Sequence, residues 1–189
     1  MPEREGDSTG PRRVRATARK LSRALSRNAG NESAATPVRM RDYGIFAATR
    51  TRRLPREYVI AASPNGIHEA VARKLTEHGI RIEPLAAARR VQVEQFVIEN
   101  VRQTERAFQG HRETSVTGRF EQRQVDLPPG SIVVRTDQPL GRLAFSLLEP
   151  ESDDGLTTWN VLDTSLNVGA PHPVLKVVDG ERLETRPAP

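Results

Sequence analysis

The sequence lacks cysteine and contains few aromatic residues. The absence of cysteine from all 189 residues excludes disulfide bonds, cysteine-ligated metal sites and thiol nucleophiles. Apolar residues make up 36% of the chain and aromatic residues 4%, which is little for a compact fold of the full length. We therefore expect part of the chain to be unstructured and the remainder to form one domain.

The sequence also lacks a long apolar run. A membrane-spanning helix needs about 18 or more such residues in succession, and no window of this chain approaches that length. The first residues are polar and do not contain the apolar segment of a secretory signal. Neither a membrane span nor a signal peptide is therefore predicted, and the compartment is left open.

Positive charge is concentrated at the front of the chain. Residues 1–56 hold 14 arginine or lysine residues against 5 aspartate or glutamate, whereas residues 57–189 hold 15 against 19. The segment 11–27 carries four small or apolar residues at near-helical spacing, namely Val14, Ala18, Leu21 and Leu25. A basic amphipathic helix of this kind can bind nucleic acid or an anionic membrane surface. A disordered basic tail over residues 1–37 is favoured, because so few apolar positions do not offset the entropy of ordering.

Two amphipathic helices are predicted after this tail. The first carries apolar residues four positions apart, at Ile67, Val71 and Leu75. It should end near Gly79. The second carries the strongest helical period in the chain, formed by Leu140, Leu143, Ala144, Leu147 and Leu148. Thr136 or Asp137 is expected to cap this helix, and Glu149 before Pro150 to end it.

Alternating or β-branched segments predict short strands. They are expected over residues 38–46, 54–61, 80–85, 91–101, 114–125, 131–135, 156–162 and 173–178. Residues 102–109 are interpreted as a loop that crosses the sheet, and the prolines near residue 173 favour an edge position for the last strand. The pattern predicts an α+β domain over residues 38–180, dominated by a mostly antiparallel sheet or sandwich, with residues 181–189 frayed.

The four histidines do not form a recognisable zinc site. A metallopeptidase site takes two ligands from one local turn, as in a His-x-x-Glu pair, plus a third from elsewhere. The residues three positions after His68, His78, His111 and His172 are Val71, Arg81, Thr114 and Leu175. None of them is acidic, so ordinary surface histidines are the favoured interpretation and no metal ligand or catalytic residue is predicted. The Gly-x-Ser-x-Gly elbow of serine hydrolases and the glycine-rich phosphate loop are also missing.

A short polar segment supplies the candidate binding residues. His111, Arg112 and Glu113 bring an imidazole, a guanidinium and a carboxylate into three consecutive positions. On a strand, His111 and Glu113 would share a face while Arg112 points away, but a structural or loop role is the favoured interpretation. Trp159, the single tryptophan, is the fourth candidate. The Asp153-Asp154 pair is interpreted as a turn instead of a catalytic pair of carboxylates.

Three segments carry a family resemblance. Residues 138–144 read Gln-Pro-Leu-Gly-Arg-Leu-Ala, and residues 148–156 read Leu-Glu-Pro-Glu-Ser-Asp-Asp-Gly-Leu, followed by Trp159-Asn160. Residues 107–112, Ala-Phe-Gln-Gly-His-Arg, add independent support. Over residues 38–180 the chain resembles the region that follows the catalytic core in large bacterial zinc carboxypeptidases, members of the carboxypeptidase A-like metallopeptidases.

The resemblance implies an enzyme family whose catalytic residues lie in another domain. No segment matches the family's His-x-x-Glu pair, its further zinc-binding histidine, its carboxylate-binding arginine or its general-base glutamate. The resemblance therefore implies a non-catalytic accessory domain, detached or encoded by a gene fragment, without a cofactor of its own although the full-length family binds zinc. Its partner would be a metallopeptidase catalytic domain or a peptide, and family members are typically exported.

Two further functions remain open from the sequence. One is nucleic-acid binding through the arginine-rich residues 11–27, although no aromatic residue lies among these arginines to stack on bases. The other is a complete small hydrolase, which the spacing of the histidines disfavours. If the domain packs on a catalytic domain, an exposed apolar face is expected around Phe96, Ile98 and Phe108.

Overall fold

A computed structural model describes residues 51–180 and 182–187. These residues belong to a single unit, Arg50–Pro189. The basic tail expected over residues 1–37 and the strand expected over residues 38–46 lie outside the described residues, so both remain predictions.

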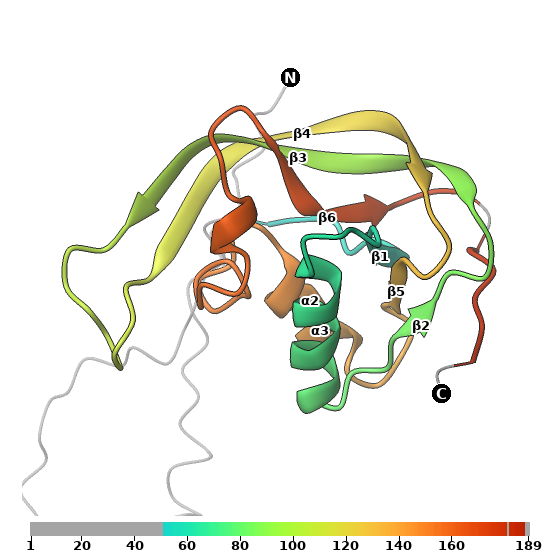
Figure 1. Cartoon of the computed structure of the whole chain (residues 1–189), viewed down its shortest axis with the longest axis horizontal. Helices are drawn as coiled ribbons and strands as arrows, with labels where there is room; N and C mark the ends of the chain where they lie inside the picture. Colours follow the sequence, from blue (N-terminus) through green and yellow to red (C-terminus); the bar gives the residue numbers. More distant parts are fainter. Residues whose placement is uncertain (1–50, 181, 188–189) are drawn as a thin grey trace, which may run out of the picture. The chain divides into compact units, whose positions relative to one another are not determined.

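Six strands form one antiparallel sheet in the order β2-β5-β1-β6-β3-β4 (Figure 1). The strands are β1 (Glu57–Ile60), β2 (Glu83–Pro84), β3 (Arg89–Gln103), β4 (Thr114–Leu127), β5 (Ile132–Arg135) and β6 (Pro171–Val177). Every strand pair in the sheet is antiparallel. The predicted α+β class with a mostly antiparallel sheet is therefore confirmed, in the form of a single sheet.

Two helices lie on one side of this sheet (Figure 1). The helix α2 (Ile67–Glu77) buries Ile67, Val71 and Leu75, which confirms the predicted stripe. The helix α3 (Gly141–Leu148) buries Gly141, Ala144, Leu147 and Leu148. Neither helix in the described part of the chain is long and apolar enough to cross a membrane.

The start of α3 differs from the prediction. Neither Thr136 nor Asp137 caps the helix, because the Thr136 hydroxyl donates to the carbonyl oxygen of Pro55 at 2.7 Å and Asp137 pairs with Arg182. The helix begins at Gly141, where a Cβ atom would lie only 1.9 Å from the carbonyl oxygen of Thr136. The close approach of these two backbone segments therefore requires glycine at this position.

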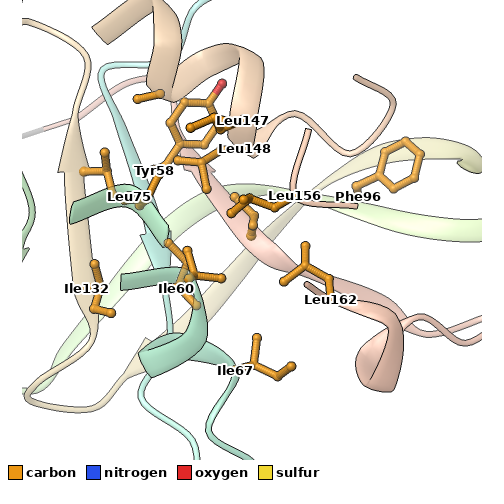
Figure 2. Packing of buried hydrophobic residues seen from close by; sticks show 14 of the residues in the cluster. Tyr58, Ile60, Ile67, Leu75, Phe96, Ile132, Leu147, Leu148, Leu156 and Leu162 are labelled. Atoms are coloured by element: carbon orange, nitrogen blue, oxygen red, sulfur yellow. The ribbon is translucent and has the colours of Figure 1, made fainter. Parts of the chain in front are cut away.

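The sheet has an apolar core on each face. The strand β1 is buried on both sides, and its successive residues alternate between the two cores. Tyr58 and Ile60 face the helices, where Tyr58 lies beside Leu147 and Leu148 (Figure 2). Val59 faces the opposite core, which is closed by Leu183 near the C-terminal end of the described residues.

The long strands β3 and β4 form a two-stranded ribbon that contributes side chains to both apolar cores. Val91 and Val93 pack in the second core, whereas Phe96 and Ile98 belong to the core on the helix side of the sheet. The two pairs occupy odd and even positions of β3, so the ordinary alternation of a strand places them on opposite faces of the sheet. Residues 104–113 link the two neighbouring strands, so the loop expected to cross the sheet is a hairpin loop instead.

The exposed apolar face predicted around Phe96, Ile98 and Phe108 is not observed. Phe96 and Ile98 are completely buried in the chain's own core, and only Phe108 is exposed, at 52%. The prediction was wrong for the two strand residues because both belong to the chain's own core, where the Phe96 ring contacts Phe120 and His172.

Two predictions about the last third of the chain were also wrong. Residues 156–162 are successive turns, because their backbone groups bond within the segment, as in Val161 N–H to Leu156 O at 3.0 Å. The strand β6 lies inside the sheet, between β1 and β3. Its prolines are tolerated there because Pro171 and Pro173 precede the residues that pair with β1, which begin at Val174.

Candidate functional site

Two of the four candidate binding residues meet in a ring contact. His111 lies in the loop between β3 and β4, and Trp159 lies in the turn segment, which we define as residues 149–163 after α3. The centroids of the two rings are 4.4 Å apart and their planes are inclined by 35°. Residues 48 positions apart in the sequence are thus brought together, and Trp159 remains 39% exposed.

The turn at the hairpin tip positions His111. Phe108 and His111 exchange two backbone hydrogen bonds, of 2.8 and 3.1 Å. Gln109 and Gly110 between them have φ angles of 49° and 87°, a left-handed pair that forms a two-residue hairpin turn. Glycine adopts this conformation readily, whereas glutamine rarely does.

Asn160 connects the two parts of this cluster. The His111 Nδ1–H donates to the Asn160 Oδ1 at 2.7 Å. The Asn160 side-chain amide donates at 2.9 Å to the Arg112 carbonyl oxygen, the Thr114 hydroxyl and the Asp163 carboxylate. Asn160 also has a φ angle of 62°, which asparagine tolerates better than most residues. In the sequence, the role of Asn160 as a link between His111 and the turn segment was indicated only by its position directly after Trp159.

Arg112 and Glu113 do not join the cluster through their side chains. Arg112 contributes its carbonyl oxygen, and Glu113 bonds Thr104 through its backbone. The Glu113 side chain lines a different groove, of about 380 Å³, together with Glu151 and Asp153. The expected pairing of His111 with Glu113 is replaced by the pairing of His111 with Asn160.

The site has two buried polar atoms without a hydrogen-bond partner among the described residues, His111 Nε2 and Asp163 Oδ1. An unsatisfied buried polar atom costs roughly 1–3 kcal/mol. Sequence reasoning missed Asp163, since it begins the short helix η2 (Asp163–Ser165) in a segment that resembled a strand.

The described residues do not fit a zinc site. Within residues 51–180 and 182–187, no group of three or more histidine, cysteine, aspartate or glutamate side chains is placed to hold a metal ion. The zinc that the family resemblance implies therefore has no set of ligands in this part of the chain.

One histidine differs from the predicted surface position. His172 is completely buried, and burial lowers the pKa of its imidazole to about 3. Its Nδ1 accepts the N–H of Val174 at 3.3 Å, and its Nε2 lies 3.2 Å from the Thr157 hydroxyl. With Nδ1 as an acceptor, the neutral ring donates from Nε2 to Thr157 and so holds the turn segment against β6.

A buried lysine cluster, consisting of Tyr58, Glu149 and Lys176, fixes the beginning of the turn segment. The Lys176 ammonium donates to Glu149 at 2.7 Å, and the Tyr58 hydroxyl donates to the other Glu149 oxygen at 2.5 Å. The ammonium also lies 3.9 Å from the centre of the Phe120 ring. Burial lowers the pKa of Lys176, against the opposing effect of Glu149, and burial together with the Glu149 charge raises the pKa of Tyr58.

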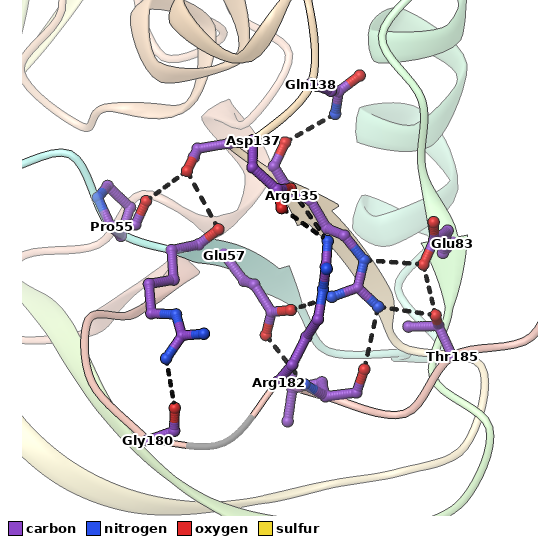
Figure 3. Close-up of polar contacts among 12 residues, drawn as sticks. Pro55, Glu57, Glu83, Arg135, Asp137, Gln138, Gly180, Arg182 and Thr185 are labelled. Atoms are coloured by element: carbon purple, nitrogen blue, oxygen red, sulfur yellow. Dashed lines mark hydrogen bonds and ion pairs between the residues drawn. The ribbon is translucent and has the colours of Figure 1, made fainter.

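An arginine cluster lies on the other face of the sheet and consists of Glu57, Glu83, Arg135 and Thr185 (Figure 3). Arg135 pairs with Glu57, donates to Glu83 at 3.0 Å and donates to Thr185 at 3.0 Å. Burial raises the pKa of Glu57, whereas hydrogen bonds from Thr185 and Arg135 lower the pKa of Glu83. This cluster ties the C-terminal residues to β1 and β5, so we assign it a structural role.

A second hollow of the surface adjoins Trp159. A groove of about 460 Å³ lies between α2, α3 and the turn segment, and Leu143, Leu156 and Trp159 are among its lining residues. The indole N–H donates to Asp154 at 2.5 Å, which fixes the ring at the edge of this groove. The turn predicted at Asp153-Asp154 is confirmed, and it positions an aromatic side chain.

Comparison with known proteins indicates a relation to carboxypeptidases. No family model matches the chain, and no solved structure matches it. The chain is 29% identical over 150 residues to proteins named Carboxypeptidase 2 from Trichophyton rubrum, Trichophyton tonsurans and Trichophyton equinum. The match covers 75% of this chain, and the chain spans 27% of the length of these relatives. The sequence resemblance pointed to bacterial enzymes, whereas these relatives are fungal; the chain is carboxypeptidase-like over three quarters of its length.

Proposed function

We propose that this chain is a non-catalytic accessory domain of the zinc carboxypeptidase type, which binds a catalytic domain or a peptide instead of cleaving one. The observation that carries the proposal is the match to Carboxypeptidase 2, which is confined to 27% of the length of those relatives. A segment of that size corresponds to one domain of a larger protein.

The placement of the charged groups supports a binding role. The lysine cluster and the arginine cluster are buried or partly buried, and their charges neutralise one another within the fold. In contrast, Trp159 and Phe108 are large apolar side chains exposed at the surface. Exposed aromatic residues beside a groove are typical of surfaces that bind other proteins.

A reconstitution experiment tests this proposal. The chain and the part of the Trichophyton rubrum Carboxypeptidase 2 outside the matched segment would be produced separately and mixed. We expect the chain alone to release no C-terminal residue from a peptide and to retain no stoichiometric zinc after dialysis. We expect the two parts to co-elute in size-exclusion chromatography.

A domain exchange provides the positive control. The matched segment of the fungal relative would be replaced by the unit Arg50–Pro189, and peptidase activity would be compared with that of the relative lacking the segment. Recovery of activity in the exchanged protein supports the accessory role. Cleavage by the isolated chain, with one bound zinc per molecule, would overturn it.

A further inference from the structure

The groove between α2, α3 and the turn segment has an apolar floor. Its lining includes Leu143, Leu147, Leu156, Trp159 and Val161. A volume of about 460 Å³ lies within the range of sites that bind ligands, roughly 300–1,000 Å³. The polar lining residues are Lys74 and His78 on α2, Ser146 on α3 and Asp154 in the turn segment.

The helix α3 is more exposed to solvent than expected for a helix with so few polar residues. Six of its eight residues are apolar or glycine, and the two polar residues are Arg142 and Ser146. A helix that is apolar on nearly all sides is normally buried on all sides, yet Leu143 is only partly buried and faces the groove. The groove is therefore the place where this helix lacks a neighbour.

The rim on the α2 side is suited to a carboxylate. Lys74 and His78 are four residues apart and share one face of the helix. Lys74 pairs with Glu77 at 2.8 Å, but both side chains are exposed, and an exposed pair of this kind is worth less than about 1 kcal/mol. A carboxylate from a ligand can therefore replace Glu77 at little cost. On the opposite rim, Asp154 is engaged by the indole N–H.

Aromatic surface continues past the groove. Trp159 is in contact with the ring of His111, which is partly exposed. A peptide whose last residue lies in the groove would leave the surface beyond Trp159 uncovered. A peptide that passes through the groove can cover the groove and this surface. The ligand geometry is therefore that of an internal peptide segment.

We propose that the groove binds an internal peptide segment in which a large apolar side chain enters between α3 and Trp159, and the carboxylate of an adjacent aspartate or glutamate pairs with Lys74. This inference deepens the proposed function, because it rests on a binding role and names the surface and the chemistry of the partner. The two ligand side chains should come from neighbouring residues of the peptide, because Lys74 and the apolar lining belong to one groove of this size.

The single tryptophan makes the test specific, because emission from Trp159 reports on the groove. The full chain would be titrated with the capped peptide acetyl-Gly-Phe-Glu-Gly-amide, and with the same peptide carrying glutamine for glutamate or alanine for phenylalanine. We expect saturable emission changes, a Kd about threefold higher for the glutamine peptide and about tenfold higher for the alanine peptide. A free-acid peptide, acetyl-Gly-Gly-Phe, should bind more weakly than the first.

Matched variants locate the binding surface. Lys74→Ala should raise the Kd for the glutamate peptide about threefold and leave that for the glutamine peptide unchanged. Arg73→Ala removes the same charge from the neighbouring, exposed position and should change neither. Leu143→Ala should raise the Kd about tenfold, whereas Leu140→Ala removes an exposed leucine outside the groove without effect.

Several results would overturn the inference. They are an absence of saturable binding, equal effects of Lys74→Ala and Arg73→Ala, and tighter binding of the free-acid peptide. Urea unfolding of each variant shows whether it is folded, and the domain exchange separates the two proposals. If the exchanged protein is active while the peptides do not bind, the groove inference fails and the accessory role stands.

Discussion

The lysine cluster and the arginine cluster lie on opposite faces of β1, and they differ in how far water is excluded. In the lysine cluster the side chains of Lys176 and Glu149 are 4% and 7% exposed. In the arginine cluster the Glu83 side chain is 35% exposed, and Arg135 distributes its hydrogen bonds over two carboxylates, a hydroxyl and the carbonyl oxygen of Leu183. A buried charge without a partner strongly destabilises the folded state. Loss of one member should therefore lower the free energy of unfolding more in the lysine cluster than in the arginine cluster.

The largest effect is expected from Glu149→Ala, which leaves the Lys176 ammonium buried without its carboxylate. We expect the free energy of unfolding to fall by about 3–5 kcal/mol, measured by urea denaturation. Glu77→Ala is the matched control, because it removes a carboxylate that also pairs with a lysine, Lys74, but at the exposed surface. Its effect should be much smaller. Equal effects of the two substitutions would show that burial of the lysine cluster does not raise the free-energy cost of losing its carboxylate.

A smaller loss, of about 3 kcal/mol, is expected from Arg135→Met. This substitution leaves Glu57 buried without its guanidinium, while Glu83 keeps its access to water. Hydrogen exchange should also become faster at the amide of Leu183, which donates to Glu57. Arg182→Met, which breaks the exposed pair with Asp137 and leaves the hydrogen bonds of Arg135 in place, is the control. If Arg135→Met lowers the free energy of unfolding more than Glu149→Ala does, the arginine cluster is the more sensitive of the two and the expectation is contradicted.

Acid should weaken the helix side of the sheet through His172. Its pKa is lowered to about 3, while an imidazole in the unfolded chain has a pKa of about 6.5. Between these values the unfolded state binds a proton that the folded state does not, so stability falls as the pH falls. From pH 6.5 to pH 5 the loss from this group is about 1.7 kcal/mol.

Urea denaturation at several pH values measures this contribution. His172→Gln should flatten the dependence of stability on pH in this window by about 1.1 kcal/mol per pH unit on average. His78→Gln, which replaces a histidine at an exposed position, is the matched control. If both variants retain the slope of the original chain, His172 is not the group responsible.

The smallest effect is expected from Thr185→Val. The Thr185 hydroxyl bonds both Arg135 and Glu83 in the partly exposed half of the arginine cluster. Loss of the hydroxyl should lower the free energy of unfolding by about 1 kcal/mol. It should also raise the pKa of Glu83 toward its ordinary value, because the hydrogen bond from Thr185 is the largest influence that lowers it. An NMR titration of Glu83 measures this shift, and an unchanged pKa would contradict the assignment.

Local patterns predicted the elements that form within a short stretch of chain. The stripe of Ile67, Val71 and Leu75 identified α2, and the alternation after Val91 identified β3. These signals depend only on which face of an element is buried. The same reasoning failed for residues 156–162, because a run of apolar and β-branched residues does not show whether a partner strand is available.

Most of the candidate site was beyond prediction for a related reason. The contact between His111 and Trp159 depends on how the hairpin tip and the turn segment fold toward each other. Asn160 acts through a left-handed backbone conformation, which an expected strand excludes. The groove beside Trp159 is formed by three segments that meet only in the folded domain.

The position of β6 has a consequence for the order of assembly during synthesis. When residues up to about 170 have left the ribosome, the available strands can form only two partial sheets, β2-β5-β1 and β3-β4. The edges of β1 and β3 then remain unpaired until β6 emerges and joins them. Folding of this domain should therefore be completed late and by distant pairings, which is slow compared with local assembly. A nascent chain held before residue 171 would present two open strand edges to chaperones.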